Sequence, residues 1–335
     1  MRLQAENDVL AVLRRRGLVG ADDTPPLTPL AGGVSSDIWK VDTSAGPVCI
    51  KRALAKLKTA KEWFAPVERN AHEADWMRIV ADIVPAAVPE FLFEDPDTGL
   101  FAMRYLDPAD YPVWKELLRD GEINIATARA VGDVLGAIHA ATAGRTSVAR
   151  RFAHDAVFQS IRIEPYLLRT AQAHPDLADR LAALAETTER TKLVLVHGDV
   201  SPKNILVGPV GPVFLDAECA WYGDPAFDLA FCLNHLLLKC IWRPQWTARY
   251  LEAYSAMTGS YLSHVDWESA GDMEARAAAL LPALLLARID GTSPVEYIVD
   301  ASDKDRVRKA ARAALVRPAE TLAGVCRIYR KEADL

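Results

Sequence analysis

The chain has 335 residues, of which 50% are hydrophobic and 25% charged, and its formal net charge is −6. This length exceeds the usual size of one domain, so we expect two lobes or domains. The acidic balance argues against a nucleic-acid-binding protein, whose domains usually carry a basic stripe. Five scattered cysteines without a C-x-x-C pair exclude a recognisable zinc site or disulfide framework. The charged N-terminus, and the lack of any apolar run of roughly 18 residues, predict a cytoplasmic protein without a membrane segment.

The first part of the chain predicts a helix followed by strands. Apolar residues at helical spacing predict a helix over residues 4–16 that stops at Gly17. After a proline-rich connector, residues 38–41 and 48–50 indicate two strands joined by a turn. The segment GGVSS, residues 32–36, precedes them, and glycines with serines between strands let backbone N–H groups approach a phosphate closely.

Lys51 directly follows the second of these strands. Three more lysines follow in a run without acids, which is typical of a solvated face: Lys56, Lys58 and Lys61. Residues 67–80 predict a helix with Glu73 near its middle. Two further strands are expected at residues 90–93 and 100–105, joined by a turn.

From residue 110 onward the pattern is helical. Residues 126–141 form a clear amphipathic pattern that includes His139, and residues 155–172 and 176–190 predict two more helices. A histidine on an apolar helix face is more often a core residue than a catalytic one, so we expect His139 to be structural.

The stretch LVLVHGDVSPKNILVGPVGPVFLDAE, residues 193–218, is the most informative part of the sequence. It predicts a strand, a polar loop and a hairpin whose far end returns to that loop. Asp199, Asn204 and Asp216 are therefore expected to converge. Two carboxylates and an amide oxygen suit Mg²⁺, which typically binds through one or two carboxylates plus substrate phosphates.

This stretch resembles the aminoglycoside phosphotransferase and choline-kinase group of small-molecule kinases, which shares the bilobal protein-kinase fold. H-G-D-x-x-x-x-N, a short hairpin and D-x-E carry the resemblance, and D-P-x-x-D-L-A follows at residues 224–230. It implies that Asp199 orients the substrate hydroxyl and accepts its proton, while Asn204 and Asp216 hold the metal. Ser201 stands where protein kinases carry a loop lysine and is expected to contact the acceptor or a phosphate. Lys203 either neutralises phosphate charge or faces solvent.

The resemblance also implies a nucleotide site in the first lobe. Lys51 would contact the α- and β-phosphates, paired with Glu73 or, as the second choice, Glu68. The phosphate-covering loop would include Gly33, Ser35 and Ser36, although it lacks the G-x-G-x-x-G pattern of protein kinases. Backbone groups of residues 104–106, including Arg104 and Leu106, would meet the purine, which leaves ATP and GTP as equal alternatives.

The acceptor site is expected to begin with Glu218, which is itself a candidate acceptor contact. Asp228 opens an apolar helix and is expected to support the catalytic loop, and Asp224 to contact the substrate or that loop. Trp221 and Tyr222 suit either a wall of the acceptor site or the core. Three residues near a helix end suit either acceptor binding or a solvated turn: Asp290, Glu296 and Tyr297. The acids among these candidates favour a cationic or polyhydroxyl acceptor.

The sequence thus predicts an α+β bilobal protein-kinase-like fold, with a small mostly β N-lobe at residues 1–106 and a large mostly helical C-lobe at residues 107–335. The predicted reaction transfers the γ-phosphoryl group of ATP or GTP to a hydroxyl of a small molecule, such as an amino alcohol, a sugar or an aminoglycoside. Mg²⁺ is the expected cofactor. We expect no nucleic-acid or membrane partner, and the protein is expected to be a monomer or a homodimer. A non-catalytic kinase-like binding protein is the alternative, and a protein kinase ranks last because no A-P-E segment follows Asp216.

Overall fold

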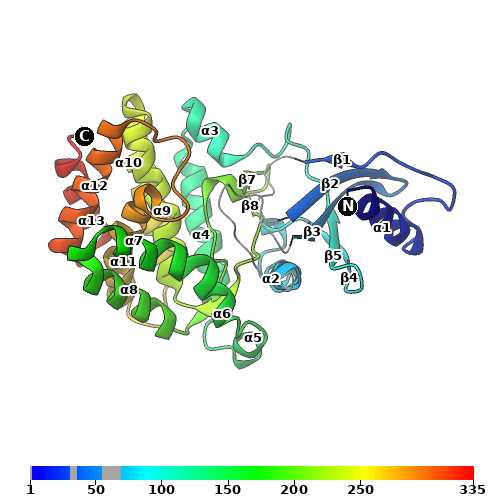
Figure 1. Ribbon diagram of the computed structural model, residues 1–335, viewed down its shortest axis with the longest axis horizontal. Helices are drawn as coiled ribbons and strands as arrows, with labels where there is room; N and C mark the ends of the chain where they lie inside the picture. The colour runs from blue at the N-terminus through cyan, green and yellow to red at the C-terminus, as the bar shows by residue number, and fades with distance from the viewer. Residues whose placement is uncertain (1, 31–35, 55–68) are drawn as a thin grey trace.

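The computed structural model describes residues 2–30, 36–54 and 69–335. It has an α+β architecture, in which a small lobe built on a sheet adjoins a much larger helical lobe (Figure 1). The predicted fold class is therefore confirmed. No helix in the described part of the chain combines the length and apolar character that a membrane crossing needs.

The sheet of the small lobe has five antiparallel strands among the described residues, in the order β1-β2-β3-β5-β4. Their bounds are Thr28–Pro29 (β1), Ser36–Thr43 (β2), Gly46–Ala53 (β3), Phe91–Asp95 (β4) and Leu100–Arg104 (β5). β2 and β3 form the predicted hairpin, in which the Thr43 hydroxyl donates to the Gly46 carbonyl at 2.7 Å. Gly46 itself has a φ of 99°, a conformation that glycine adopts without steric penalty.

Each face of this sheet packs on a different helix. Val48 and Ile50 of β3 share a core cluster with Val9 and Val12 of helix α1 (Arg2–Arg15). Cys49, between them, belongs instead to the cluster that contains helix α2 (Arg69–Ile83). Because side chains alternate along a strand, Lys51 follows Cys49 onto the α2 face. This alternation directs the Lys51 ammonium toward Glu73.

The large lobe is organised around helix α9 (Pro225–Trp242), whose residues are buried along nearly its whole length. A helix that is buried on all sides is expected at the centre of a helical lobe. Its neighbours include α10 (Thr247–Leu262), α11 (Ala270–Asp290) and α12 (Ala301–Val316). The remaining helices are α3 (Trp114–Asp120), α4 (Ile125–Thr142), α5 (Thr146–Arg151), α6 (Asp155–Phe158), α7 (Arg169–Ala173), α8 (Ala178–Arg190) and α13 (Leu322–Glu332).

Two short strand pairs carry the stretch that the sequence singles out. Strand β6 (Val194–Val196) pairs with β9 (Trp221–Gly223), and β7 (Ile205–Val207) forms a hairpin with β8 (Pro212–Phe214), as predicted. In Figure 1 the β7–β8 hairpin lies at the junction of the two lobes. The His197 ring, in the loop between β6 and β7, meets the Trp76 ring of α2 edge-on with centroids 4.8 Å apart, so this loop faces the small lobe.

One predicted helix has an unexpected form. Between α6 and α7 the chain continues as a π-helix over Gln159–Leu168 that contains Pro165. Proline has no N–H and clashes with the carbonyl four residues earlier, so an ordinary α-helical ladder is interrupted there. Such wider turns are frequent at functional sites.

Candidate active site

A buried charge network joins the sheet of the small lobe to the β8 end of the hairpin. The Lys51 ammonium lies 2.5 Å from Glu73 Oε2 and also contacts Asp216 Oδ1. Burial alone would lower the pKa of Lys51, but Asp216 and Glu73 more than offset it and hold the pKa above its ordinary value. The Asp216 backbone N–H also donates to Glu73 Oε1 at 3.1 Å. Lys51 and Glu73 together therefore fix the position of Asp216.

The pKa values of the two carboxylates in this network, Glu73 and Asp216, are shifted in opposite directions. Burial raises the pKa of Glu73, and the nearby Lys51 offsets this only in part. Burial acts in the same direction on Asp216, but Lys51 and Lys203 outweigh it and lower the pKa of Asp216. Asp216 is thus held as the charged carboxylate that a metal ligand must be.

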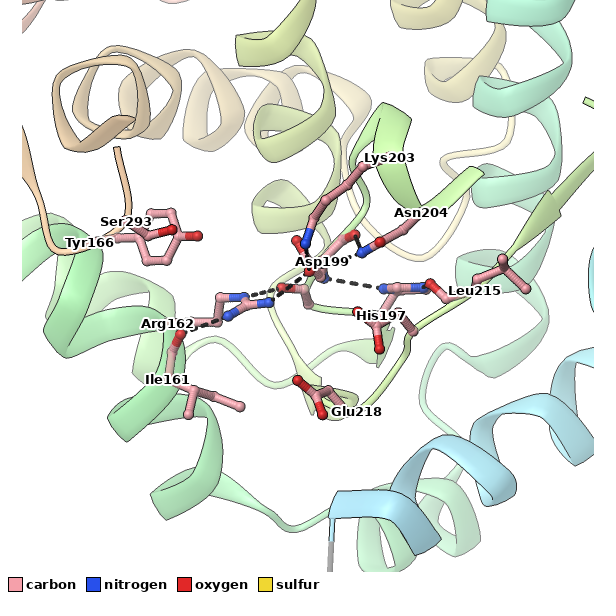
Figure 2. Close-up of polar contacts among 12 residues, drawn as sticks. Ile161, Arg162, Tyr166, His197, Asp199, Lys203, Asn204, Leu215, Glu218 and Ser293 are labelled. Atoms are coloured by element: carbon pink, nitrogen blue, oxygen red, sulfur yellow. Dashed lines mark hydrogen bonds and ion pairs between the residues drawn. The ribbon is translucent and has the colours of Figure 1, made fainter. Parts of the chain in front are cut away.

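Asp199 lies in the loop after β6, and three donors meet on one of its oxygens (Figure 2). Asp199 Oδ2 accepts from Asn204 Nδ2 at 2.9 Å and lies 3.1 Å from Arg162 Nη2 and 3.3 Å from Lys203 Nζ. Asp199 Oδ1 accepts no hydrogen bond within the described ranges. The carboxylate is therefore oriented through one oxygen and leaves the other available.

The loop backbone is anchored from the N-terminal turn of α9. Asp228 accepts from the N–H groups of His197 at 2.7 Å and Gly198 at 2.8 Å, which satisfies two buried donors with one carboxylate. Asp228 Oδ2 also lies 3.3 Å from His139 Nε2. Both residues are fully buried. Asp228 holds the loop backbone and His139 lies in the core behind it, in agreement with the role that the sequence predicts for each.

The hairpin brings Asp216 back beside the loop. The Leu215 N–H donates to the Asn204 carbonyl at 2.9 Å, and the His197 ring contacts the Leu215 carbonyl at 3.1 Å. Asp199 and, after the opposing effect of burial, Asp216 both raise the pKa of Lys203, so its ammonium lies near both carboxylates. The three predicted oxygen-bearing residues are thus brought to one region.

Asn204 and Asp216 suit a metal ion that is also coordinated by a substrate. No group of three or more His, Cys, Asp or Glu side chains suited to a metal occurs in the described residues. Asn204 and Asp216 alone would hold an ion incompletely. Mg²⁺ is usually bound in this incomplete way by protein, with phosphate oxygens and water filling the remaining positions.

The predicted nucleotide-binding residues are only partly described. Gly33, Ser35, Glu68 and the lysines Lys56, Lys58 and Lys61 lie outside the described residues, and Ser36 is buried at the start of β2. The Arg104 N–H donates to the Glu90 carbonyl at 2.8 Å, and the Tyr105 N–H to the Pro47 carbonyl at 3.2 Å. Sheet pairing therefore already occupies two of the amides predicted to meet the purine, which leaves Leu106.

The acids proposed for the acceptor all have cationic partners within the protein. The shortest ion pair of each is Glu218–Arg69 at 2.9 Å, Asp224–Arg276 at 3.3 Å, Asp290–Arg308 at 2.7 Å and the Glu296–Lys115 contact. Asp224 is also the N-cap of α9, and burial, partly offset by Arg276, raises its pKa to about 6. The expectation that these acids attract a cation therefore loses its basis.

Trp221 and Tyr222 belong to the core. The Trp221 ring stacks on Phe158 with centroids 4.0 Å apart, and the Tyr222 hydroxyl donates to the Leu193 carbonyl at 2.6 Å. Both side chains are buried, which favours the core over a wall of the acceptor site. Ser201 is also buried, and its hydroxyl lacks a hydrogen-bond partner among the described residues.

Arg162 is the site residue that sequence analysis did not identify. Besides Asp199, its Nε donates to the Gly198 carbonyl and its Nη1 to the Ile161 carbonyl at 2.7 Å. It projects from the π-helix, 37 positions before Asp199 in the chain, so no local motif connects the two. The only signal in the sequence was that Arg162 lies three residues before Pro165 in a predicted helix.

Comparison with known proteins supports the resemblance. A family model described as "Phosphotransferase enzyme family" matches residues 26–272. Methylthioribose kinase 1 of Oryza sativa subsp. japonica is 25% identical over 253 residues, which cover 66% of this chain and 58% of the rice protein. The match therefore spans little more than half the length of that curated relative.

Two solved structures share the fold at low sequence identity. An ethanolamine kinase from Plasmodium vivax gives a TM-score of 0.57 at 13% identity, covering 96% of this chain and 88% of that one. An amicoumacin kinase in complex with AMP-PNP, Ca²⁺ and Ami gives a TM-score of 0.56 at 13% identity, covering 96% and 97%. The bilobal kinase-like fold is common to all three.

Proposed function

Because the chain belongs to this phosphotransferase enzyme family, we propose that it transfers the γ-phosphoryl group of ATP or GTP to a hydroxyl of a small molecule. The observation that carries the proposal is the arrangement at the lobe junction. Lys51, Glu73 and Asp216 form one charge network, and Asp199 with Asn204 lies beside it. We also propose the lobe boundary near residue 106, because the sheet ends at Arg104 and the next helix begins at Trp114.

On the acceptor side, we assign Asp199 as the group that orients the hydroxyl and takes its proton. Arg162, Lys203 and Asn204 all contact Oδ2, so the proton would pass from the substrate oxygen to Oδ1. These donors also hold the carboxylate in one rotamer. Positioning of this kind lowers the barrier because the reacting groups need not search for their geometry.

On the donor side, Lys51 would contact the nucleotide phosphates, with Glu73 holding the lysine in place. Asn204 and Asp216 would hold Mg²⁺, which when bound neutralises negative charge on the phosphates. Lys203, whose side chain is half exposed, would add positive charge beside Asp199. In these assignments four charged or polar side chains would surround the nucleotide phosphates: Lys51, Lys203, Asn204 and Asp216.

The names of the relatives indicate a broad class of acceptor. The rice relative is a methylthioribose kinase, and the solved structures with this fold include kinases named for ethanolamine and amicoumacin. We propose a small hydroxyl compound, such as a sugar or an amino alcohol, as the acceptor of this chain.

The proposal is tested by nucleotide binding and turnover together. Mg-ATP or Mg-GTP should raise the melting temperature, and a panel of sugars and amino alcohols should stimulate release of ADP or GDP. The Asp199→Asn variant should bind nucleotide but lose turnover by roughly 10²–10⁴-fold, the usual effect of removing a general base. Nucleotide binding without turnover of any acceptor would favour a non-catalytic binding protein instead.

A further inference from the structure

The side of Asp199 that faces away from the hairpin is rich in cations. Figure 2 shows Arg162, Tyr166 and Ser293 on one side of Asp199, with His197 and Leu215 on the other. The hairpin side leads to Asp216 and the nucleotide network, so the opposite side is where an acceptor would approach. The question is which acceptor chemistry this side suits.

Two arginines lie over one tyrosine ring there. The guanidinium of Arg162 lies 5.7 Å from the ring centroid of Tyr166, and that of Arg288 lies 5.8 Å from it. Arg288 Nη1 also lies 3.2 Å from the Tyr166 hydroxyl, and it donates to the Ser293 carbonyl at 2.5 Å. Arg288 has no carboxylate partner among the described residues, although buried arginines are nearly always paired.

The positive charge continues into helix α9. The Lys239 ammonium is buried and lies 4.7 Å from the Tyr297 ring centroid. Burial, followed by the charge of Lys115, lowers the pKa of Lys239 to about 8. Burial and then Arg288, Lys239 and other cations hold the pKa of His235 well below its ordinary value. Glu296, which is paired with Lys115, raises the pKa of Lys239 only in part, so the cations of this region outweigh the nearby negative charge.

Two buried nitrogen atoms in this region lack any acceptor. Arg288 Nε and His235 Nε2 have no hydrogen-bond partner within the described ranges, and their residues are only 8% and 6% exposed. His235 Nδ1 lies 3.2 Å from the Tyr297 hydroxyl. When that hydroxyl donates to Nδ1, the proton of neutral His235 is on Nε2, which then needs an acceptor. A buried donor without an acceptor destabilises the structure.

An anionic ligand would supply both missing features, negative charge and acceptor oxygens. We infer that the acceptor of the phosphotransfer reaction proposed above carries an anionic group, a carboxylate or a phosphate, that binds beside Tyr166 through Arg288 and Lys203. Arginine and lysine are the usual partners of such groups, and arginine can bind them through two parallel hydrogen bonds. The Lys203 side chain, half exposed, provides the approach from solvent.

The test uses four compounds that share a hydroxyl and differ in charge: glycerol, glycerate, glycerol phosphate and the quaternary ammonium analogue of glycerol. Each is titrated at constant ionic strength into the protein saturated with Mg-AMP-PNP, which occupies the nucleotide site. We expect glycerate or glycerol phosphate to bind at least about tenfold more tightly than glycerol, since hydrogen bonds to charged groups are the stronger ones. The two anions distinguish a carboxylate site from a phosphate site.

Variants separate the inferred site from general charge effects. Arg288→Gln should reduce anion affinity at least about tenfold, and Arg288→Lys should restore part of it. Because Arg288 is buried, Lys203→Gln at the half-exposed lysine provides a second variant that does not depend on core packing. Arg190→Gln, at an exposed arginine on α8, is the matched control and should leave anion affinity unchanged.

Equal affinity for all four compounds, or a preference for the ammonium analogue, would overturn the inference. So would an anion preference that survives in both Arg288→Gln and Lys203→Gln. Failure of Mg-AMP-PNP to stabilise the protein would instead count against the proposed function itself. The two failures are therefore distinguishable in the same experiment.

Discussion

Asp216 combines an unusual backbone conformation with an ion pair to Lys51. Its φ is 68°, in the left-handed region where aspartate is one of the few tolerated residues other than glycine. Its N–H donates to Glu73, and its carboxylate contacts Lys51. Backbone conformations of this kind persist where surrounding contacts determine them, and they cluster at functional sites. The lysine of β3 thus sets both the charge and the position of the proposed metal ligand.

Removing that lysine should destabilise the protein as well as weaken nucleotide binding. Lys51→Met leaves Glu73 and Asp216 without their shared cation, and breaking a buried ion pair in this way costs about 3–5 kcal/mol. Urea unfolding measures the change. Lys309→Met, at a largely exposed lysine of α12, is the control and should change stability by less than about 0.5 kcal/mol. A Lys51→Met variant as stable as wild type would contradict the network described.

The sequence allowed us to predict the site residues that lie in one continuous motif. Asp199, Asn204 and Asp216 lie within 18 positions of one another, so strand and hairpin geometry alone bring them together. Arg162 and Arg288 reach the same region from helices remote in sequence. The partners of Asp290 and Glu296 are equally remote, so the sequence showed unpaired acids where the fold has ion pairs.

At the scale of elements, the catalytic loop depends on close packing at Gly198. Its φ is 78°, and a Cβ there would lie 2.7 Å from the Cys219 carbonyl oxygen and 2.9 Å from Cys219 Cβ. A side chain would therefore face both backbone strain and a steric clash. Because Asp199 is the next residue, any shift that relieves the clash also moves the proposed base.

Gly198→Ala should accordingly reduce both stability and turnover. The left-handed conformation costs about 1–2 kcal/mol and overpacking about 1–3 kcal/mol, so we expect a loss of about 2–5 kcal/mol in urea unfolding. Gly211→Ala, in the β7–β8 turn, is the control because a Cβ at that position would have no neighbour within 4 Å among the described residues and its φ is not positive. Equal stability of the two variants would contradict the packing described.

The elements themselves were mostly predictable. Short apolar runs on either side of a turn identified the β2–β3 hairpin, and the Gly/Pro turn identified β7–β8. The π-helix at Gln159–Leu168 was not predictable, because Pro165 predicts an interruption but not its form. That form determines which way Arg162 points, so the sequence could not place the arginine.

At the scale of the whole molecule, buried histidines should make stability sensitive to acid. Burial first, with nearby cations for His235, lowers the pKa of His235 and His197 below the ordinary value. Below about pH 6.5 the unfolded chain binds protons that the folded protein does not, so stability falls as pH falls. Each such histidine contributes roughly 1.4 kcal/mol per pH unit. Burial raises the pKa of Asp224 to about 6 and that of Glu73 to about 7, so both act in the opposite direction as pH falls through these values and offset part of the loss.

The pH effect can be assigned to one residue. His235→Asn removes a titrating group, so its loss of stability between pH 6.5 and 5.5 should be smaller than that of wild type by roughly 1 kcal/mol. Urea unfolding at the two pH values measures this difference. Identical losses in the variant and the wild type would show that His235 is not kept neutral by the fold.

The central claim is that Asp199 serves the transfer of a phosphoryl group to a hydroxyl. The most direct measurement is ³¹P NMR of the reaction mixture with Mg-ATP and an acceptor panel, for wild type and Asp199→Asn. The account predicts that a phosphate monoester forms with wild type and that its rate falls roughly 10²–10⁴-fold in the variant. Formation of only ADP and inorganic phosphate with every acceptor, at equal rates in both proteins, would contradict it.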